Sequence, residues 1–448
     1  MKKFEQYCDK VSRLYPELHH REDYSGKILT QNVTFQVTDA CNLCCSYCYQ
    51  LHKGNRRMSF ETAKKFIDML ISGEKGMEAY INPIKSPGLV VDFIGGEPFL
   101  EIELIDQICT YLMDRLIELK HPWAMRTMFS MCSNGVLYRD EKVQKFLKKW
   151  QNRLSFSVTV DGNRELHDAC RVFPDGSPSY DYAIDAVTDW MSKGNYMGSK
   201  ITIAPENISF LFDAVKHMVE LGYDDINANC VYEKGWKTSH ATVLYDQMKR
   251  ISDYFLDGDF DFEHHLYCSL YNDDFFKPKQ EDDLQTWCGG TGNSMISVDP
   301  DGKIFPCIRY MESSLAGEQE PYCIGDVDNG IAYNDCTRCR IDCMAKIDRR
   351  TQSTDKCFYC PIASGCSNCS AYDYQVFGTP DSRATYICVM HQARALGNYY
   401  FWNKYYRKLG KKERMEIHIP EEWALEIISR EEWDMLKKLA NGRTDIKE

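Results

Sequence analysis

The chain has 448 residues, of which 44% are hydrophobic and 27% charged, a composition typical of a folded globular protein. This length exceeds the roughly 100 to 200 residues of one ordinary domain, so we expect a large core with at least one added module. The net charge is -12 with no long Lys/Arg stripe, which argues against nucleic acid as a partner. No run approaches the roughly 18 apolar residues of a membrane span, and the N-terminus lacks a signal-peptide core, so we expect a cytoplasmic protein with no membrane partner.

The 21 cysteines are therefore expected in a reducing compartment, where close-spaced thiols hold metal more often than they form disulfides. Their odd number also argues against a fully paired disulfide framework. Six stand alone in the sequence and are expected to be small buried hydrophobic residues: Cys8, Cys109, Cys132, Cys170, Cys230 and Cys268.

Residues 31–235 alternate apolar, strand-like runs with amphipathic helical patterns in about six units. This alternation predicts a parallel sheet that is closed or partly closed into a (β/α)6 barrel of the TIM type. The first helix is expected at SFETAKKFIDMLI, with Ser59 as its N-cap.

The remaining segments differ in composition. Residues 1–30 are an N-terminal extension, 236–287 a connector, 288–395 a separate cysteine-rich module, and 396–448 a helical tail. The tail contains NYYFWNKYY, whose aromatic side chains we expect to pack against the rest of the protein rather than form a peptide-binding surface.

The stretch CNLCCSYCYQ follows the first predicted strand, where barrel enzymes carry their chemistry. Thiolates at Cys41, Cys45 and Cys48 can hold three irons of a 4Fe–4S cluster and leave the fourth iron free. A zinc site or another iron–sulfur loop can share this spacing. The motif resembles the CxxxCxΦC loop of radical S-adenosylmethionine enzymes, with Tyr47 as the aromatic residue near the adenine and Cys44 as a bystander.

Further stretches resemble cofactor-binding motifs of that family. Gly95, Gly96, Glu97 and Pro98 reproduce its GGEP, whose backbone and carboxylate receive the methionine ammonium. The resemblance implies that Ser133 and Asn134 lie at the ribose of S-adenosylmethionine, and that Thr159, Asp161 and Gly162 take the place of the family's SxDG. It also implies that Arg171 pairs with the methionine carboxylate, from an HDxxR-like stretch that includes His167 and Asp168. Ile203 and Pro205 would lie near the adenine. Each turn can also be explained by ordinary turn chemistry.

The cysteine-rich module contains Cys288 and Cys307, then Cys357, Cys360, Cys366 and Cys369 with C-x2-C-x5-C-x2-C spacing, and Cys388. This arrangement is similar to the SPASM domain, which holds two auxiliary 4Fe–4S clusters. That resemblance implies Cys357, Cys360, Cys366 and Cys388 as ligands of the outer cluster, and Cys288, Cys307 and Cys369 as ligands of the inner one. The inner set is one ligand short, which suggests an open iron or another thiol. Four cysteines between Cys307 and Cys357 have no assigned role: Cys323, Cys336, Cys339 and Cys343. A zinc ribbon is the alternative for any single CxxC pair.

The resemblance implies an enzyme that cleaves S-adenosylmethionine reductively and modifies a ribosomally made precursor peptide, forming a sulfur-to-carbon thioether. An external donor such as flavodoxin or ferredoxin would supply electrons. The alternatives are an anaerobic sulfatase-maturing enzyme and an iron–sulfur electron carrier. The acidic residue expected after the second inner cysteine of the sulfatase-maturing group is replaced by Ile308 and Arg309, and no catalytic base is identified.

Overall fold

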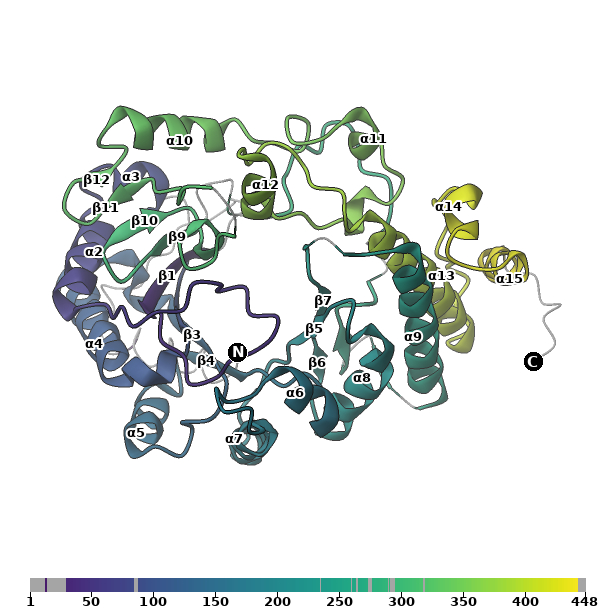
Figure 1. The fold of residues 1–448 in the computed structure, drawn as a ribbon, viewed down its shortest axis with the longest axis horizontal. Helices are drawn as coiled ribbons and strands as arrows, with labels where there is room; N and C mark the ends of the chain where they lie inside the picture. Colours follow the sequence, from purple (N-terminus) through teal and green to yellow (C-terminus); the bar gives the residue numbers. More distant parts are fainter. Residues whose placement is uncertain are drawn as a thin grey trace.

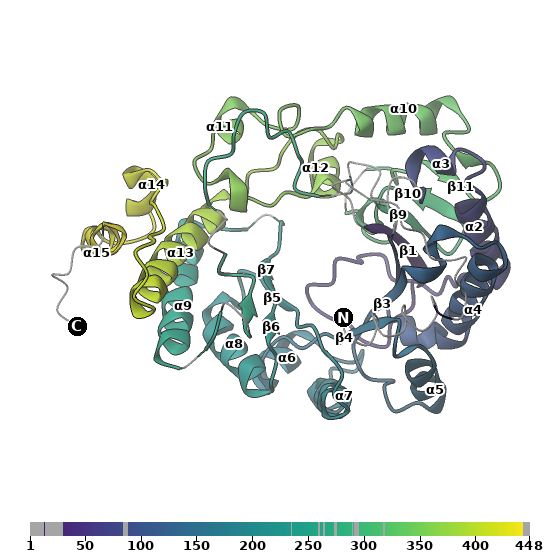
Figure 2. The same cartoon turned by 180° about the vertical axis from the view of Figure 1, so that it is seen from behind.

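The computed structural model describes residue 13 and residues 30–83, 88–233, 235–258, 260–262, 265–272, 276–288, 290, 295–316 and 319–441. The N-terminal extension therefore lies outside the described residues except at positions 13 and 30. The elements form an open ring, with strands on the inside and helices on the outside (Figures 1 and 2).

Seven short strands form the first part of the ring: β1 (Thr30–Thr38), β2 (Gly88–Gly95), β3 (Thr127–Ser133), β4 (Leu154–Val158), β5 (Ile201–Ile203), β6 (Asp225–Ile226) and β7 (Ala228–Cys230). The first four pair in parallel in chain order, and β5 pairs in parallel with β7. The predicted α/β partial barrel is thus confirmed, with its strands divided between separate sheets.

Helices follow the strands and cover their outer side (Figure 1). The α-helices are α2 (Phe60–Ser72), α3 (Met77–Tyr80), α4 (Ile102–Glu118), α5 (Glu141–Trp150), α6 (Arg164–Cys170), α7 (Tyr180–Ser192) and α8 (Leu211–Glu220), with 3-10 turns η2 (Pro98–Glu101), η3 (Pro122–Met125) and η4 (Ile208–Phe210). Ser59 caps α2 as predicted, because its Oγ accepts from the Thr62 amide at 3.0 Å.

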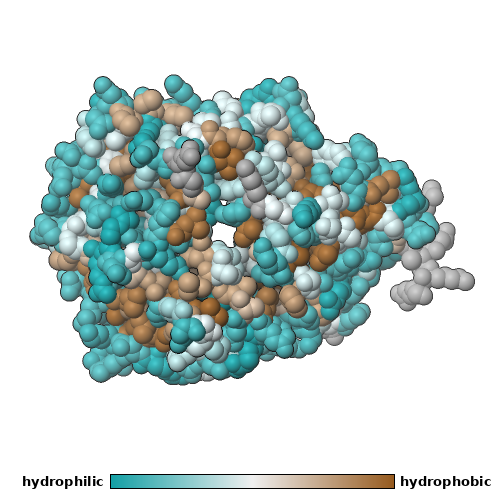
Figure 3. Space-filling model, in the orientation of Figure 1, coloured by the Kyte–Doolittle hydropathy of each residue, from teal (hydrophilic) through white to brown (hydrophobic). Residues whose placement is uncertain are grey.

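Side chains alternate between the two faces of these strands. Phe35, Phe93 and Phe129 point toward the helices and pack ring to ring across β1, β2 and β3, with centroids 5.8 and 6.1 Å apart. Cys132 on β3 and Ser155 on β4 face the other way and are exposed. The inside of the ring is therefore open, and Figure 3 shows a hollow at its centre.

The cysteine-rich module continues the same sheet. Strand β9 (Met295–Val298) pairs in parallel with β1, and antiparallel strands follow: β10 (Lys303–Phe305), β11 (Gly325–Asp326) and β12 (Gly330–Ile331). The sheet order is β12-β11-β10-β9-β1-β2-β3-β4, so β1 lies between the two parts of the chain. The sequence predicted a separate module and contained no sign of this pairing.

The remaining elements belong to the connector, the cysteine-rich module and the tail. They are α9 (Thr238–Asp257), β8 (Tyr267–Cys268), η6 (Ile308–Tyr310), α10 (Asp335–Ala345), α11 (Asp355–Phe358), η7 (Ala363–Gly365), α12 (Ser370–Phe377), α13 (Cys388–Lys408), α14 (Glu421–Leu425) and α15 (Arg430–Ala440). No helix in the described ranges is both long and apolar enough to cross a membrane.

Two of these helices alter the expected organisation. Helix α9 fills much of the expected connector and lies beside α13 (Figures 1 and 2), where a Cβ on Gly397 would stand 2.6 Å from Met248 Cε. The expected boundary at residue 395 falls inside α13. The tail aromatics Tyr399, Phe401 and Tyr405 are buried, as the packing interpretation predicted.

Candidate functional site

The first cysteine loop leaves the end of β1 and runs across the middle of the ring (Figure 1, purple). Its backbone is fixed to the end of α6 and the residues after it, because the Cys44 amide donates to Val172 O at 2.8 Å and the Ser46 amide to Cys170 O at 3.0 Å. Lys53 Nζ donates to Leu43 O at 3.0 Å from within the loop. The loop therefore has a defined shape supported by residues distant in sequence.

Four thiols on this loop differ in exposure. Cys41, Cys45 and Cys48 are half-buried, whereas Cys44 is exposed. Burial raises the pKa of Cys41 to about 11 and also raises that of Cys45, and the Cys45 thiol further raises the pKa of Cys41. Two neighbouring thiols whose pKa values are raised fit a bound cation, because a cation favours the thiolate.

Among the described residues, no three Cys, His, Asp or Glu side chains converge on one point as a single metal ion requires. A 4Fe–4S cluster instead takes its thiolates at separate corners of a cube.

The GGEP turn is hydrogen-bonded to the start of the cysteine loop. The Gly96 amide donates to Thr38 O at 3.0 Å, and the Glu97 amide donates to Ala40 O at 2.9 Å. A Cβ on Gly96 would stand 2.3 Å from Ala40 O. Glycine is therefore required here because the protein backbone crosses itself, whereas the resemblance to GGEP implied close approach of a ligand.

The Glu97 carboxylate is buried and already has three donors in the protein. It accepts from Ser133 Oγ at 2.7 Å, from the Asn134 amide at 2.8 Å and from the Phe99 amide at 3.1 Å. Burial raises the pKa of Glu97, and these donors oppose the rise. The carboxylate thus ties the end of β2 to the end of β3, and the adjacent Pro98 is buried at the start of η2.

The turn after β3 also contacts the cysteine loop and β4. Asn134 Nδ2 donates to Asn42 Oδ1 at 2.7 Å. The Thr159 amide donates to Ser133 O at 3.0 Å, and Thr159 Oγ1 lies 3.2 Å from Cys132 Sγ. The ends of β1, β2, β3 and β4 therefore meet at one edge, where the sequence predicts the site. Asn42 was missed because an isolated loop asparagine carries no motif.

Tyr47, Asp161 and Arg171 form a buried polar cluster beside the thiols. The Tyr47 hydroxyl donates to Asp161 Oδ2, and Arg171 Nη1 donates to the Tyr47 oxygen at 2.9 Å. Burial raises the pKa of Asp161, and the Arg171 charge opposes the rise. Asp161 Oδ1 and Arg171 Nε are buried without a hydrogen-bond partner in the described part of the chain. Unpaired groups of both signs fit a zwitterionic ligand such as the methionine part of S-adenosylmethionine.

The other predicted residues of this group have structural contacts. His167 Nε2 lies 3.1 Å from Ser179 Oγ, and burial lowers the pKa of His167 to about 3. Asp168 Oδ1 accepts from the Ser179 and Tyr180 amides at the start of α7. Ile203 is buried in the separate β5–β7 sheet, where its carbonyl accepts from the Val231 amide at 2.9 Å.

The structure brings together Cys288, Cys307 and Cys369, which we call the inner trio. The sulfurs of Cys288 and Cys307 lie 3.5 and 3.8 Å from the point where a Cβ on Gly290 would stand. Burial raises the pKa of Cys307, which is half-buried, and the thiols of Cys369 and Cys288 raise it as well. A side chain on Gly290 would fill the space between the thiols, so this cradle has room for a bound group.

Cys357, Cys360, Cys366 and Cys388 also come together, and we call them the outer four. They line a cavity of about 380 Å³ together with His391. Burial raises the pKa of Cys388 to about 12, and the other three thiols raise it further. The His391 ring is buried, and neither of its nitrogens meets hydrogen-bond geometry with a partner in the described part of the chain, although the Ser367 backbone is near. An unpaired ring beside four thiols fits a cluster that supplies a polar partner.

The unassigned cysteines lie elsewhere. Cys336, Cys339 and Cys343 follow one another along α10, and the first two are exposed. Cys323 Sγ lies 3.0 Å from Gly325 O. Among the lone cysteines, Cys109 and Cys268 are buried as expected, Cys170 and Cys230 are half-buried, Cys132 is exposed, and Cys8 lies outside the described residues.

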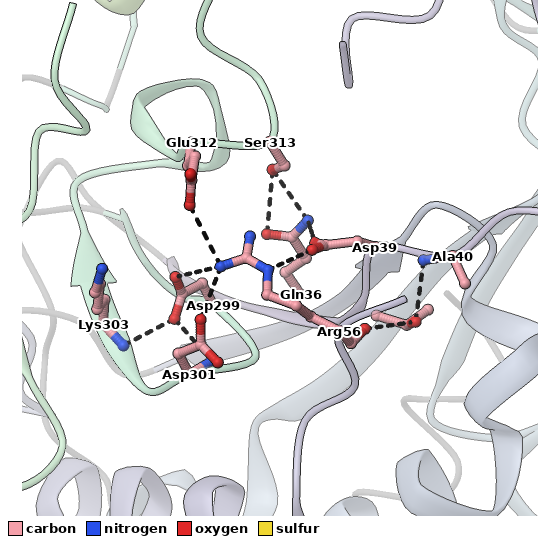
Figure 4. Close-up of polar contacts among 10 residues, drawn as sticks. Gln36, Asp39, Ala40, Arg56, Asp299, Asp301, Lys303, Glu312 and Ser313 are labelled. Atoms are coloured by element: carbon pink, nitrogen blue, oxygen red, sulfur yellow. Dashed lines mark hydrogen bonds and ion pairs between the residues drawn. The ribbon is translucent and has the colours of Figure 1, made fainter. Parts of the chain in front are cut away.

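Figure 4 shows how the first cysteine loop is joined to the second module. Arg56 donates to Asp39 Oδ2 at 2.5 Å, just before the loop, and to Asp301 Oδ2 at 2.8 Å in the β9–β10 turn. Gln36 Nε2 donates to Ser313 Oγ at 3.0 Å, beyond η6. Arg56 was not singled out in the sequence, because its partners are distant along the chain.

No family model matches the chain. It is 28% identical over 214 residues to an uncharacterised protein of Methanocaldococcus jannaschii, covering 48% of this chain and 66% of that protein. It is 32% identical over 153 residues to a serine-type anaerobic sulfatase-maturating enzyme of Bacteroides thetaiotaomicron, covering 32% of each. It is 22% identical over 294 residues to the subtilosin biosynthesis protein AlbA of Bacillus subtilis, covering 64% and 56%. The chain thus spans between one third and about two thirds of these relatives.

Two solved structures share the fold. One is the protein anSMEcpe with bound AdoMet, with a TM-score of 0.59 and 14% identity over 85% of this chain and 98% of that one. The other is SuiB of Streptococcus suis bound to its precursor peptide SuiA, with a TM-score of 0.51 and 14% identity over 84% and 78%. At 14% identity, these two structures show that the chain shares their fold over most of its length.

Proposed function

We propose that the chain is a radical S-adenosylmethionine enzyme that modifies a ribosomally made, cysteine-containing peptide in the cytoplasm. The observation that carries this proposal is the unpaired Asp161 Oδ1 and Arg171 Nε beside the thiols of Cys41, Cys45 and Cys48. An electron carrier needs no such polar cradle. The relatives support the substrate class, because AlbA is described as a subtilosin biosynthesis protein and SuiB is described with a precursor peptide.

The proposed roles follow the contacts of each residue. Cys41, Cys45 and Cys48 bind the first 4Fe–4S cluster, and Asp161 with Arg171 orients the amino acid part of S-adenosylmethionine. Gly95, Gly96 and Thr159 contribute backbone and hydroxyl groups around it, while Glu97 fixes the turns. When bound, the cluster and S-adenosylmethionine supply a 5′-deoxyadenosyl radical, which removes hydrogen from the substrate.

The peptide is proposed to enter the open inside of the ring. The inner trio binds a second cluster and the outer four a third, with flavodoxin or ferredoxin as the external donor. Because the inner trio offers three thiols, an added peptide thiolate can take a fourth position there. That arrangement suits formation of a sulfur-to-carbon thioether.

The alternative is formylglycine formation in a sulfatase, which the Bacteroides relative's name supports. Ile308 stands directly after Cys307, where that activity would need an acidic residue as its base, and Arg309 follows it. Thioether formation is therefore the preferred function.

The test is anaerobic reconstitution with iron and sulfide, followed by dithionite and S-adenosylmethionine. Release of 5′-deoxyadenosine is expected from the unaltered chain and is expected to be lost in Cys45→Ser. The control is Cys44→Ser, which changes the neighbouring exposed thiol and is expected to keep the release. No 5′-deoxyadenosine from the unaltered chain would contradict the proposal, and equal loss in both variants would contradict the ligand assignment.

A further inference from the structure

Arg309 lies at a junction between the first cysteine loop and the inner trio. It is two residues beyond Cys307, and its side chain is 21% exposed. The centre of its guanidinium is 5.6 Å from the centroid of the Tyr49 ring, a residue that directly follows Cys48. Its charge interacts with the thiol of Cys369. The Arg309 guanidinium therefore lies over Tyr49, next to the thiols of the first cysteine loop, and also lies beside the inner trio.

A residue that follows β7 in the barrel also contacts Arg309. Glu233 Oε1 accepts from Arg309 Nη2 at 2.9 Å. Its neighbour Tyr232 is close to the thiols of Cys369 and Cys288. The last strand of the barrel, the first cysteine loop and the inner trio thus converge on one guanidinium.

The charge of Arg309 does not change across the pH range of proteins, because a guanidinium stays protonated. A cluster that gains an electron becomes more negative, so a nearby fixed cation favours its reduced state. The effect is stronger in a partly buried site than in water, because screening is weaker there. Glu233 carries the opposite charge and disfavours the reduced state of the cluster. Its effect is weaker than that of Arg309 because its side chain is 46% exposed.

We propose that Arg309 is a positioning residue that holds the inner trio against Tyr49 and raises the reduction potential of the iron–sulfur cluster bound there. Glu233 lowers that potential and fixes the guanidinium in place. This inference rests on the proposed function, because it requires a cluster on Cys288, Cys307 and Cys369.

The experiment is a redox titration followed by electron paramagnetic resonance. It uses the full chain with Cys41, Cys45 and Cys48 changed to alanine, so that auxiliary clusters alone contribute. The inner signal is identified as the one lost in Cys307→Ala. The variants are Arg309→Gln, Arg309→Lys and Glu233→Gln. The control is Arg139→Gln, which removes the same charge from an exposed pair with Asp185 and Asp189.

The reduction potential of the cluster on the inner trio is expected to become more negative in Arg309→Gln. It is expected to become more positive by a smaller amount in Glu233→Gln and to stay unchanged in Arg139→Gln. Arg309→Lys, which keeps the charge, is expected to stay close to the unaltered value. Equal potentials in Arg309→Gln and Arg139→Gln overturn the inference, as does a shift in the same direction for Arg309→Gln and Glu233→Gln. If Arg309→Gln loses the cluster, the sign of the Glu233→Gln shift decides.

The two proposals can fail separately. Cleavage of S-adenosylmethionine by the unaltered chain, together with unshifted potentials in the variants, overturns the role of Arg309 alone. Absence of an inner signal from the chain that keeps Arg309 and Cys307 overturns this inference and the proposed second cluster together.

Discussion

Gly96 lies so close to Ala40 that a Cβ on the glycine would stand 2.3 Å from the alanine carbonyl oxygen. Gly96→Ala must therefore displace the backbone before the first cysteine loop, and we expect it to lower the stability by roughly 1–3 kcal/mol. Thermal unfolding measures this change. The matched control is Gly198→Ala, where the nearest atom is 3.8 Å away and little change is expected. Equal melting temperatures for both variants would contradict the close approach.

Tyr47→Phe removes the hydroxyl that joins Asp161 to Arg171. Both charged groups are buried, so each loses a hydrogen bond that water cannot replace, and we expect a loss of about 1–3 kcal/mol. Binding of S-adenosylmethionine, measured by calorimetry on the reconstituted protein, is expected to weaken as the pair loses its orientation. The control is Tyr182→Phe, whose side chain is 50% exposed. A Tyr47→Phe protein as stable as this control would show that the hydroxyl does not support the pair.

Asp299 gives a prediction for pH. Burial raises its pKa from 3.8 to about 6. Between these values the folded protein binds more protons than the unfolded chain, so this group makes stability fall as pH rises from about 4 to 6. The loss approaches about 3 kcal/mol above pH 6.

Asp299→Asn is expected to remove that loss. The Asp301 and Lys303 amides both donate to Asp299 Oδ1, at 3.0 and 2.8 Å, and an asparagine oxygen can accept both. The melting temperature of the variant minus that of the unaltered chain should therefore increase from pH 4 to pH 7. A constant difference across this range would mean that Asp299 does not titrate there.

Cys366→Ala is expected to remove one cluster, or about four irons per chain, because Cys366 is one of the outer four. Cys339→Ala on the exposed face of α10 is the control and is expected to keep its iron. Chemical iron analysis after reconstitution measures both. Loss of iron in the control would instead assign a cluster to the α10 cysteines.

Local sequence was sufficient for the features that depend on neighbouring residues. Ser59 capping α2 and the polar turns ending β2 and β3 follow from short patterns, and they place Glu97 and Asn134 at one edge. The pairing of β9 with β1 joins residues more than 250 positions apart, and no periodicity reveals such a register. The contacts of Arg56 and Arg309 were not predicted for the same reason, since their partners come from other elements. The sequence also did not reveal that β5 pairs with β7 in a sheet separate from β4.

The parallel pairing of β9 with β1 gives the first strand two neighbours, β2 on one side and β9 on the other. A chain truncated before residue 288 would leave β1 with an unpaired edge, and an isolated second module would lack the strand on which β9 aligns. Exchanging one of these two parts between related proteins therefore requires more than joining chains at a linker. A functional chimera would have to keep β1 and β9 from the same parent.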